Sequence, residues 1–545
     1  MVHKCLDQDT LQEVQDTLKK FATKHLPREK RLEWDRKDFF PEELVRKMVS
    51  PEVGLHLLFL PEEYGGLGGG AYDIYRVSEE MAKIDLGMAT AFLAISLGTD
   101  PLRVGGTQEQ KQKWMTRIAE EGLIVAYGAT EPGAGSDLAA LKTQAEPVYD
   151  AEKKLAYRLN GVKQFITNGG VADIYSILAV APQGPSFFIV EKGMQGLSHG
   201  KQEEKHGIRL SNTTQVILDN VLVPAENLVG MKEGEGISQA VSVFGYTRLM
   251  VAAFGLGAGE SALQYAIDYG KQRMQFGKPL LEMQGYTHKL LVPHAIHLEA
   301  ARYYIEETAK RLDGGETGLE TEGAIAKLFA TETGNQAAEA AIQAHGGYGY
   351  THEYEVEKIK RDVRITMIYE GTSEIMQQTI GKNRWSKFLQ TKGAYYTKIA
   401  EEMDQIARED ENCGASSLSK AIHTLVAAME YIREKRLTRE QYVLFQMADM
   451  ITAVETSSAL CRKAFELKKI PSSHVDYVRA AAKVYAAEVL SNLTKNVSFY
   501  LTAFGTNTLS EIQRLNRICN FEESTRCYDG IGDAMNQMIL VTASV

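Results

Sequence analysis

Residues 127–137 of this chain read YGATEPGAGSD, and residues 160–170 read NGVKQFITNGG. In the first stretch a strand ends in small residues and a threonine, and Pro132 and two glycines leave backbone N–H groups open to a flat or anionic ligand. In the second, Phe165 and Thr167 stand two residues apart in an extended run, a spacing that puts both on one face. For either residue alone a structural role is the better interpretation. Two such stretches about 30 residues apart in one region favour a binding site.

The region around these stretches is rich in short strands. Runs of β-branched and aromatic residues, bounded by Gly, Pro and Asn, occur at 174–181, 186–191 and 213–218. Such runs are typical of strands, so we expect a small β domain with antiparallel connections between about residues 123 and 238.

Helical periodicity flanks the β region on both sides. Val14, Leu18 and Phe21 recur at helical spacing, so residues 1–122 are expected to be helical. The helices expected after the β region lie at 247–274, 280–312, 322–345, 418–434, 439–467 and 476–504, with Thr438 as the N-cap of the fifth. The predicted domains are 1–122, 123–238, 239–391 and 392–545.

The composition limits the classes of protein. The chain has 545 residues, of which 44% are hydrophobic and 24% charged, as in ordinary globular proteins. Its 61 basic and 71 acidic residues give a net charge of −10, which argues against a nucleic-acid binder. The five cysteines contain no CxxC pair, so neither a disulfide framework nor a zinc site is expected. These features favour an ordered enzyme in a reducing compartment.

The start of the chain and its hydrophobicity bear on location. The first residues, MVHKCLDQDT, lack an apolar core and resemble neither a secretory signal nor a transit peptide. No stretch approaches the roughly 18 consecutive apolar residues of a membrane span. We expect a cytoplasmic location in a prokaryote, or the mitochondrial matrix if the chain is a processed form.

Three glycine-rich stretches suggest a dinucleotide fold at first sight, at 66–70, 133–135 and 255–259. None lies between a hydrophobic parallel strand and a helix with an acidic residue about 20 positions further on, as such a fold requires. Turns and close helix packing are the better interpretation for each stretch. A nicotinamide-dependent enzyme is therefore disfavoured.

A carboxylate near residue 370 is a candidate general base. Glu370 follows an apolar run and precedes a Gly-Thr pair that is able to start a helix. Partial desolvation there would raise its pKa and strengthen it as a base. The alternative is a carboxylate that only stabilises a helix N-terminus through the dipole. The spacing alone leaves the two interpretations equal.

Taken together, these segments resemble the acyl-CoA dehydrogenase family over roughly residues 1–390. The motifs TEPGAGSD, FITNGG, RMQFGKPL, QAHGGYGYTHEYEVEKIKRD and IYEGTSEI occur in the order typical of that family. Residues 203–230 and the long helical extension look most like the very-long-chain branch. The resemblance implies a mainly α fold with an N-terminal helical domain, a β-barrel-like middle domain, a four-helix bundle and an added C-terminal helical domain.

The resemblance also implies a reaction. In the family, FAD takes the β-hydrogen of an acyl-CoA thioester as hydride while a carboxylate removes the α-proton, which yields a trans-2-enoyl-CoA. Glu370 matches the family base. Its backbone N–H and a ribityl hydroxyl of FAD match the donors to the thioester oxygen. Electrons then pass to electron-transfer flavoprotein, in fatty-acid β-oxidation or related acyl-CoA degradation.

Twelve residues match flavin contacts of the family. Phe165 stands where several members have Trp, which preserves stacking but removes an indole N–H, and Glu374 replaces a Gln of some members. An acidic group near a diphosphate is unfavourable unless it faces the ribose. The flavin matches are Tyr127, Ala129 and Thr130 beside the isoalloxazine, Phe165 and Thr167 near its reactive face, Arg273, Gln275, Phe276, Gln343 and Gly347 toward the FAD of a neighbouring subunit, and Thr372 and Glu374 near the ADP part.

A smaller set matches contacts to the acyl-CoA substrate. Gly245 replaces an Asp present in medium-chain members, so one contact is expected to be absent. An intrahelical salt bridge is the structural alternative for Arg248. The substrate matches are Ser136 for the pantetheine, Phe244 and Arg248 on a helix beside that arm, and Tyr369 and Gly371 next to the base.

Residues 391–545 form the extension beyond most family members. They contain 18 basic and 19 acidic residues, a net of −1, against 43 and 52 in the rest of the chain. Residues 433–439, REKRLTR, form a local basic patch. By analogy with long-chain relatives the extension is expected to support a homodimer and to dock on a membrane surface. A solvated helical domain with a charged loop is the equal alternative.

Three classes of function stay open from the sequence. The first is the dehydrogenase, which we favour. The second is an acyl-CoA oxidase on the same architecture, which passes electrons to oxygen. The third is a non-enzymatic assembly factor, which need not retain Glu370, Phe165 and Arg273.

Overall fold

The computed structural model describes residues 5–149, 152, 155–470, 472–505, 513, 532–536 and 538. The chain forms two compact units. Unit 1 contains the chain up to Ala258 together with 309–317 and 361–365, and unit 2 contains 259–308, 318–360 and 366–545. The predicted four-domain boundaries are a finer division, and they stay a prediction.

The N-terminal part of unit 1 is helical, as predicted. Asp7 begins the first helix because its side chain accepts the backbone N–H of Thr10 at 2.9 Å. The predicted apolar positions Val14, Leu18 and Phe21 are buried on one face of it. The helices are α1 (Gln8–His25), α2 (Arg28–Arg36), α3 (Glu42–Val49), α4 (Ala71–Ile84), α5 (Leu86–Gly105) and α6 (Gln108–Glu121).

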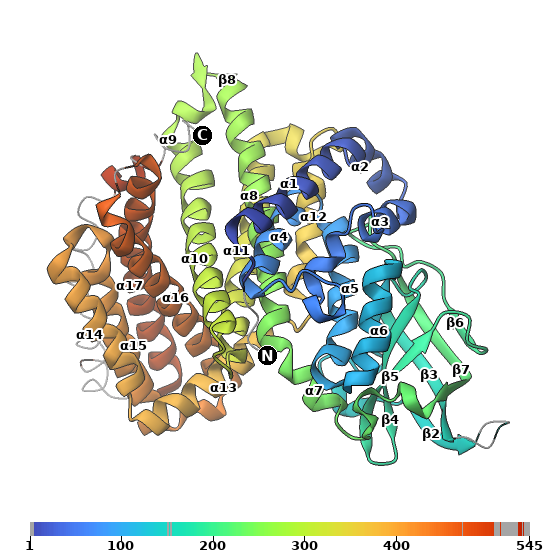
Figure 1. Ribbon diagram of the computed structural model, residues 1–545. Coiled ribbons are helices and arrows are strands. Elements are labelled where there is room, and N and C mark those ends of the chain that lie inside the picture. The colour runs from blue at the N-terminus through green and yellow to red at the C-terminus, as the bar shows by residue number, and fades with distance from the viewer. Residues whose placement is uncertain are drawn as a thin grey trace. The chain divides into compact units, whose positions relative to one another are not determined.

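A seven-stranded sheet follows, in the order β1-β4-β2-β3-β7-β6, with β5 paired to β4. The prediction of antiparallel connections is wrong for two strand pairs, since β1 and β2 each pair parallel with β4. Helix α5 packs against β1, and Figure 1 shows strands β2 to β7 gathered together, coloured blue-green to green. The strands are β1 (Val125–Gly128), β2 (Gln144–Tyr149), β3 (Leu155–Thr167), β4 (Ile174–Ala181), β5 (Gly184–Glu191), β6 (Leu197–His199) and β7 (Thr213–Pro224).

Helices return after the sheet. Helices α7 (Gly236–Ser242) and α8 (Phe244–Gln272) come first, and the end of α8 leads into a short hairpin of β8 (Met274–Gln275) and β9 (Lys278–Pro279). The predicted continuous helix at 280–312 is wrong in its first part, where a π-helical turn, Thr287–Leu291, precedes the regular helix. Pro293 follows this turn and has no N–H to donate to the preceding turn, which explains the irregularity.

Unit 2 consists of helices from the family-like part of the chain and from the extension. Figure 1 shows α14 to α17 side by side, coloured orange to red. The predicted N-cap Thr438 is wrong: Thr438 lies in a short 3₁₀ helix, Leu437–Arg439, and Glu440 is the N-cap of the helix that follows. The helices are α9 (Gln284–Tyr286), α10 (Val292–Asp313), α11 (Glu320–His345), α12 (Val356–Val363), α13 (Ser373–Thr391), α14 (Ala394–Glu409), α15 (Ala415–Lys435), α16 (Gln441–Glu466) and α17 (Ser473–Gly505), of which α10 and α12 also contribute residues to unit 1.

A buried polar network joins the extension to the helices of unit 2 that precede residue 392. Arg384 of α13 donates to both carboxylate oxygens of Glu455 on α16, at 2.7 and 2.8 Å, and to Glu322 of α11 at 3.0 Å. Tyr396 of α14 and Tyr304 of α10 donate to the same Glu455 carboxylate at 3.0 and 3.1 Å. All five side chains are buried. The extension is thus part of the core of unit 2.

Within the described part of the chain, no single helix is long and apolar enough to cross a membrane. The bent pair Gly236–Ser242 and Gly245–Gln272 meets that criterion only when its two helices are taken together.

Candidate active site

Three of the predicted site residues have a left-handed backbone. Among the described residues, ten non-glycine positions have positive φ, and they include Phe165 (φ 58°), Phe276 (φ 50°) and Glu370 (φ 54°). This conformation is unfavourable for bulky side chains and is found preferentially at binding and catalytic sites. The backbone therefore singles out three positions that the motifs had singled out independently.

Phe165 lies at an irregularity of β3. The register between β3 and β7 shifts between Lys163 and Ile166, which marks a β-bulge. Ile166 is buried, whereas the Phe165 ring is 64% exposed and the neighbouring Thr167 is half-buried. The expectation that Phe165 and Thr167 share a face assumed regular alternation, which the bulge interrupts. What the structure does present is an exposed aromatic ring beside a hydroxyl, a pair suited to a planar ligand.

A buried ion pair fixes the backbone beside Phe165. The Lys163 ammonium donates to Glu131 Oε1 at 2.7 Å and to the Ala129 carbonyl at 3.2 Å, and Lys163 is fully buried. Burial lowers the pKa of Lys163 to about 8, while Glu131 opposes this shift. The backbone N–H of Gln164 also donates to the Thr130 carbonyl at 2.9 Å. The two predicted flavin segments are therefore joined directly before Phe165, where Lys163 bonds Ala129 and Gln164 bonds Thr130.

The same Glu131 carboxylate organises the glycine-rich turn. It accepts the backbone N–H groups of Lys142 at 2.7 Å and Thr143 at 3.0 Å. Burial would raise the pKa of Glu131, but the hydrogen bonds from Lys163 and from this turn lower it below its usual range. No atom lies within 4 Å of the space that a Cβ on Gly133 or Gly135 would fill. The Glu131 carboxylate thus holds the chain on both sides of the glycines, and the space beside the glycines is open.

The remaining predicted residues of unit 1 lie near these segments or on α8. Ser136 is exposed in the glycine-rich turn, and the half-buried Tyr127 ring contacts Phe187 at a centroid distance of 5.5 Å. Arg248 is buried on α8. Phe244 begins α8, and its side chain lies outside the described residues.

The turn that carries Glu370 belongs to unit 2. Glu370 is half-buried, and Gly371, with φ 95°, follows it. The fully buried Lys327 of α11 donates to the Gly371 carbonyl. Thr372 then caps α13, accepting the backbone N–H of Ile375 at 3.3 Å. The predicted helix start after Glu370 is confirmed, and the carboxylate lies before the cap and not in the first helical turn.

The segments predicted to reach a neighbouring subunit come together within unit 2. Phe276, at the tip of the β8–β9 hairpin, is 93% exposed, and Gln275 beside it is also exposed. The Arg273 guanidinium lies over the Tyr348 ring at 5.9 Å, next to the exposed Gly347. Gln343 is exposed at the end of α11, and Glu374 is exposed in the first turn of α13, while Tyr369 and Thr372 are half-buried.

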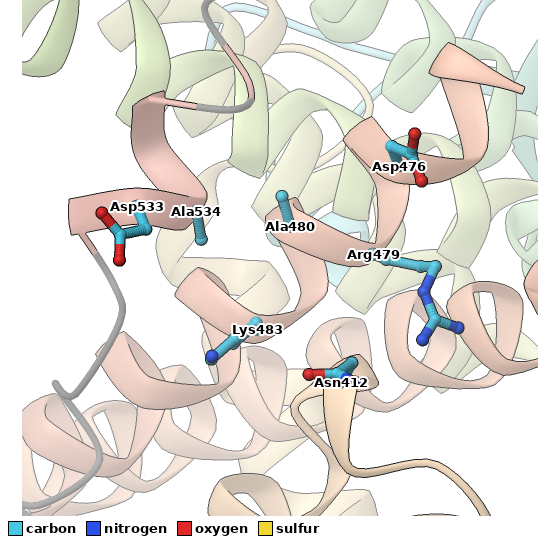
Figure 2. A pocket seen from close by; sticks show the side chains of 7 residues that line it. All are labelled: Asn412, Asp476, Arg479, Ala480, Lys483, Asp533 and Ala534. Carbon is cyan, nitrogen blue, oxygen red and sulfur yellow. The ribbon is translucent and has the colours of Figure 1, made fainter.

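A cavity of about 350 Å³ lies elsewhere, in the extension. Figure 2 shows Arg479 and Lys483 from one helix and Asn412 from a turn around it. Arg479 is paired with Asp410 at 2.6 Å, and the lining contains acidic and basic groups in equal number. None of the predicted site residues lines this cavity, so it is not the predicted site. Its lining residues are Asn412, Asp476, Arg479, Ala480, Lys483, Asp533 and Ala534.

The sequence analysis missed three supporting residues: Lys163, Glu131 and Lys327. Lys163 and Glu131 lie inside the quoted motifs. The available signal was a lysine in a predicted strand that is otherwise rich in apolar residues. Lys327 had no comparable signal, because its partner is a backbone carbonyl 44 residues away.

The chain is thus helical, then a sheet, then helical again, with an exposed aromatic ring beside a glycine-rich turn in unit 1 and a half-buried carboxylate on a constrained turn in unit 2. The model of the acyl-CoA dehydrogenase N-terminal domain matches residues 8–122, that of the middle domain 126–221 and that of the C-terminal domain 234–384. The chain belongs to the acyl-CoA dehydrogenase family, a family of FAD-dependent oxidoreductases, as predicted.

Two curated relatives each match about two thirds of the chain. An acyl-CoA dehydrogenase of Bacillus subtilis is 40% identical over 354 residues, which cover 64% of this chain and 91% of the relative. A short-chain-specific acyl-CoA dehydrogenase of Megasphaera elsdenii is 38% identical over 358 residues, again 64% of this chain and 91% of the relative.

Among solved structures, an acyl-CoA dehydrogenase from Bacillus anthracis complexed with FAD has a TM-score of 0.82 and 25% identity, and the match covers 97% of this chain and 95% of that chain. This match includes the extension. In the structure named for the electron transferring flavoprotein of Acidaminococcus fermentans, a chain matches with a TM-score of 0.64 and 35% identity over 69% of this chain and 98% of that chain.

Proposed function

We propose that the chain catalyses the FAD-dependent α,β-dehydrogenation of an acyl-CoA thioester to a trans-2-enoyl-CoA, with Glu370 as the general base. The observation that carries this proposal is the turn at 369–372. There a half-buried carboxylate sits on a left-handed residue, which is followed first by the Gly371 carbonyl that Lys327 anchors and then by a capped helix. A carboxylate held in this way is suited to a base, because it does not have to be ordered during the reaction.

Each residue then has a defined task. The Glu370 carboxylate takes the α-proton, and the Glu370 backbone N–H donates to the thioester carbonyl oxygen, on which negative charge develops. FAD, when bound, accepts the β-hydrogen as a hydride. Phe165, Thr167, Tyr127, Ala129 and Thr130 hold the isoalloxazine ring, with Lys163 and Glu131 fixing their backbone. Ser136, Phe244, Arg248, Tyr369 and Gly371 bind the substrate.

The electron acceptor in this proposal is electron-transfer flavoprotein. The match to a chain in the Acidaminococcus fermentans structure supports it, since that structure is named for such a flavoprotein. An oxidase that uses oxygen is the second candidate. Production of hydrogen peroxide during turnover without an added acceptor would favour the oxidase.

The exposed hairpin at 273–279 supports a homodimer. Phe276, Met274 and Tyr350 are strongly exposed apolar or aromatic side chains in this part of unit 2. In the proposed dimer Arg273, Gln275, Phe276, Gln343 and Gly347 contact the FAD of the partner subunit, and Thr372 and Glu374 contact the ADP part. Sedimentation equilibrium of the FAD-loaded protein tests this arrangement, and a monomer would refute it.

Two observations bear on the length of the acyl chain, and they point in opposite directions. The predicted very-long-chain branch rests on residues 203–230 and on the extension, whereas a relative named short-chain-specific is 38% identical over 64% of this chain. The proposal includes a cytoplasmic location and peripheral membrane contact through residues 392–545. The exposed basic residues of 433–439 support this contact.

One experiment tests the proposed reaction. FAD-loaded protein is mixed anaerobically with a panel of acyl-CoA thioesters of short, long, branched and aromatic chains, and bleaching of the oxidised flavin is recorded. At least one thioester should reduce the flavin and yield its trans-2-enoyl product. Absence of bleaching with every member would refute the dehydrogenase and favour the assembly factor.

A further inference from the structure

Helix α16 of the extension lies directly against α13, the helix that begins after the Glu370 turn. A Cβ on Gly381 of α13 would lie 2.8 Å from Leu444 Cγ and 3.0 Å from the Leu444 carbonyl oxygen on α16. Glycine is a poor residue for the middle of a helix, and here it permits a close approach of two backbones. The two helices are therefore fitted to each other, not merely adjacent.

Two polar anchors fix α13 to α16. Gln377, one turn into α13, donates its side-chain N–H to both oxygens of Asp449, at 2.8 and 3.0 Å. Two turns further on, Arg384 makes the bidentate contact with Glu455. Both acceptors belong to the extension and both donors to α13. The extension thus determines where α13 lies along its length.

The start of α13 is in turn continuous with the catalytic turn. Ser373, its first residue, donates to Glu332 of α11 at 2.6 Å, and Lys327 of α11 holds the Gly371 carbonyl. Helix α11 thus supports the turn from the family-like part of the chain. Asp449 supplies a second support from the extension at Gln377, one turn after Ser373.

We propose that the extension is a positioning element of the active site, in which Asp449 and Glu455 act through α13 on the base Glu370. The inference rests on the proposed function of Glu370 and adds to it a role for the extension. A displacement of a base by about 1 Å is enough to slow proton transfer about 100-fold. Fixing α13 at Gln377 and Arg384 keeps the Glu370 carboxylate and its backbone N–H in their productive position.

A matched contact separates positioning from general stabilisation. Arg462 of α16 pairs with Glu307 of α10 at 3.2 Å and with Glu402 of α14 at 2.8 Å. These bonds also tie α16 to the rest of unit 2, but they do not involve α13. Glu307→Gln therefore weakens the attachment of the extension without loosening the helix that follows the base.

The experiment measures removal of the α-proton alone. The full-length, FAD-loaded protein is incubated in deuterated buffer with an acyl-CoA analogue that carries sulfur in place of the β-carbon. This analogue can exchange its α-hydrogens but cannot give up a β-hydride, and mass spectrometry reports the exchange. Asp449→Asn and Gln377→Met are compared with Glu307→Gln at equal flavin content, well below each unfolding temperature.

We expect Asp449→Asn and Gln377→Met to slow exchange about tenfold or more, and Glu307→Gln to stay within about twofold of the unmodified protein. Equal rates for all three variants would overturn the inference. Glu455→Gln should act in the same direction, and if it does not fold, the two milder variants still decide. Glu370→Gln is the reference: its exchange at the unmodified rate would refute the base itself, whereas loss of its exchange with unimpaired Asp449→Asn would refute only the positioning role.

Discussion

Strand β3 of unit 1, which carries Phe165, and the turn of unit 2 that carries Glu370 both present a residue in a left-handed conformation, but they are supported differently. Phe165 lies two residues after Lys163, whose ammonium is bonded to Glu131, 32 residues away within unit 1. The Glu370 turn depends on Lys327, 44 residues away from Gly371, and its helix on Asp449, 72 residues away from Gln377. One site is supported by the sheet region of unit 1 and the other by helices of unit 2 that include the extension, so they should fail in different ways.

Glu455→Gln should have the largest effect on stability. It removes the charge that balances the buried Arg384 guanidinium and leaves Glu322 as its remaining carboxylate partner. Loss of one member of a buried ion pair costs about 3–5 kcal/mol of unfolding free energy. Urea denaturation followed by circular dichroism measures this loss. A decrease below about 1 kcal/mol would contradict the buried network, and Glu402→Gln at the more exposed pair is the control.

The same network shows that the extension cannot simply be removed. A chain ending at residue 391 lacks Glu455 and Tyr396, and the buried faces of α11 and α13 become exposed to water. We expect such a truncated chain to be insoluble or to unfold at low denaturant concentration. A soluble, flavin-binding truncated chain would show that unit 2 does not need the extension.

Lys163→Met should have the next largest effect, and it should fall on the flavin. The variant leaves the Glu131 carboxylate buried without its cationic partner, which costs about 3 kcal/mol. We expect a lower ratio of flavin to protein, because the Ala129 carbonyl loses its bond from Lys163. The double variant Lys163→Met with Glu131→Gln should recover part of the unfolding free energy. Full flavin content in the single variant would contradict the positioning of these residues.

Gly371→Ala should act mainly on the base turn. Gly371 has φ 95°, a conformation that costs a non-glycine residue about 1–3 kcal/mol. The added Cβ would also lie 2.6 Å from the Met376 methyl group, which must move aside. We expect slower flavin reduction by acyl-CoA with little change in flavin content. Gly285→Ala, at a helical glycine with open space around it, is the control and should leave both unchanged.

The smallest expected effect is a pH dependence at Asp449. Burial raises the pKa of Asp449 from 3.8 to about 6, Glu332 adds to the shift and Gln377 opposes it. The folded state therefore binds this proton more tightly than the unfolded chain, and the resulting stability is lost as the pH rises through about 6.

The Asp449→Asn variant lacks this loss. Its melting temperature relative to that of the unmodified protein should therefore rise by about 1–3 °C between pH 5 and pH 7.5. Differential scanning calorimetry at the two pH values measures the difference. A constant difference would show that Asp449 is not protonated more easily in the folded protein. Glu339→Gln on the exposed side of α11 is the control.

The two regions also differ in how far the sequence predicts them. The strand at 174–181 has the predicted bounds, and the helix after Glu370 starts where the motif indicated. The parallel pairing of β1 and the bulge at Phe165 depend on strands distant in sequence, and periodicity does not report them. Lys327 and Asp449 act on α13 and its turn from other helices, so no local pattern marks them.

The most direct test of the account is the rate of flavin reduction in Glu370→Gln. Stopped-flow absorbance under anaerobic conditions, with an acyl-CoA that reduces the unmodified protein, compares this variant with Glu339→Gln. We predict that Glu370→Gln keeps its oxidised flavin spectrum and is reduced about 10²–10⁴-fold more slowly, while Glu339→Gln is unchanged. Reduction of Glu370→Gln at the unmodified rate would contradict the assignment of the base.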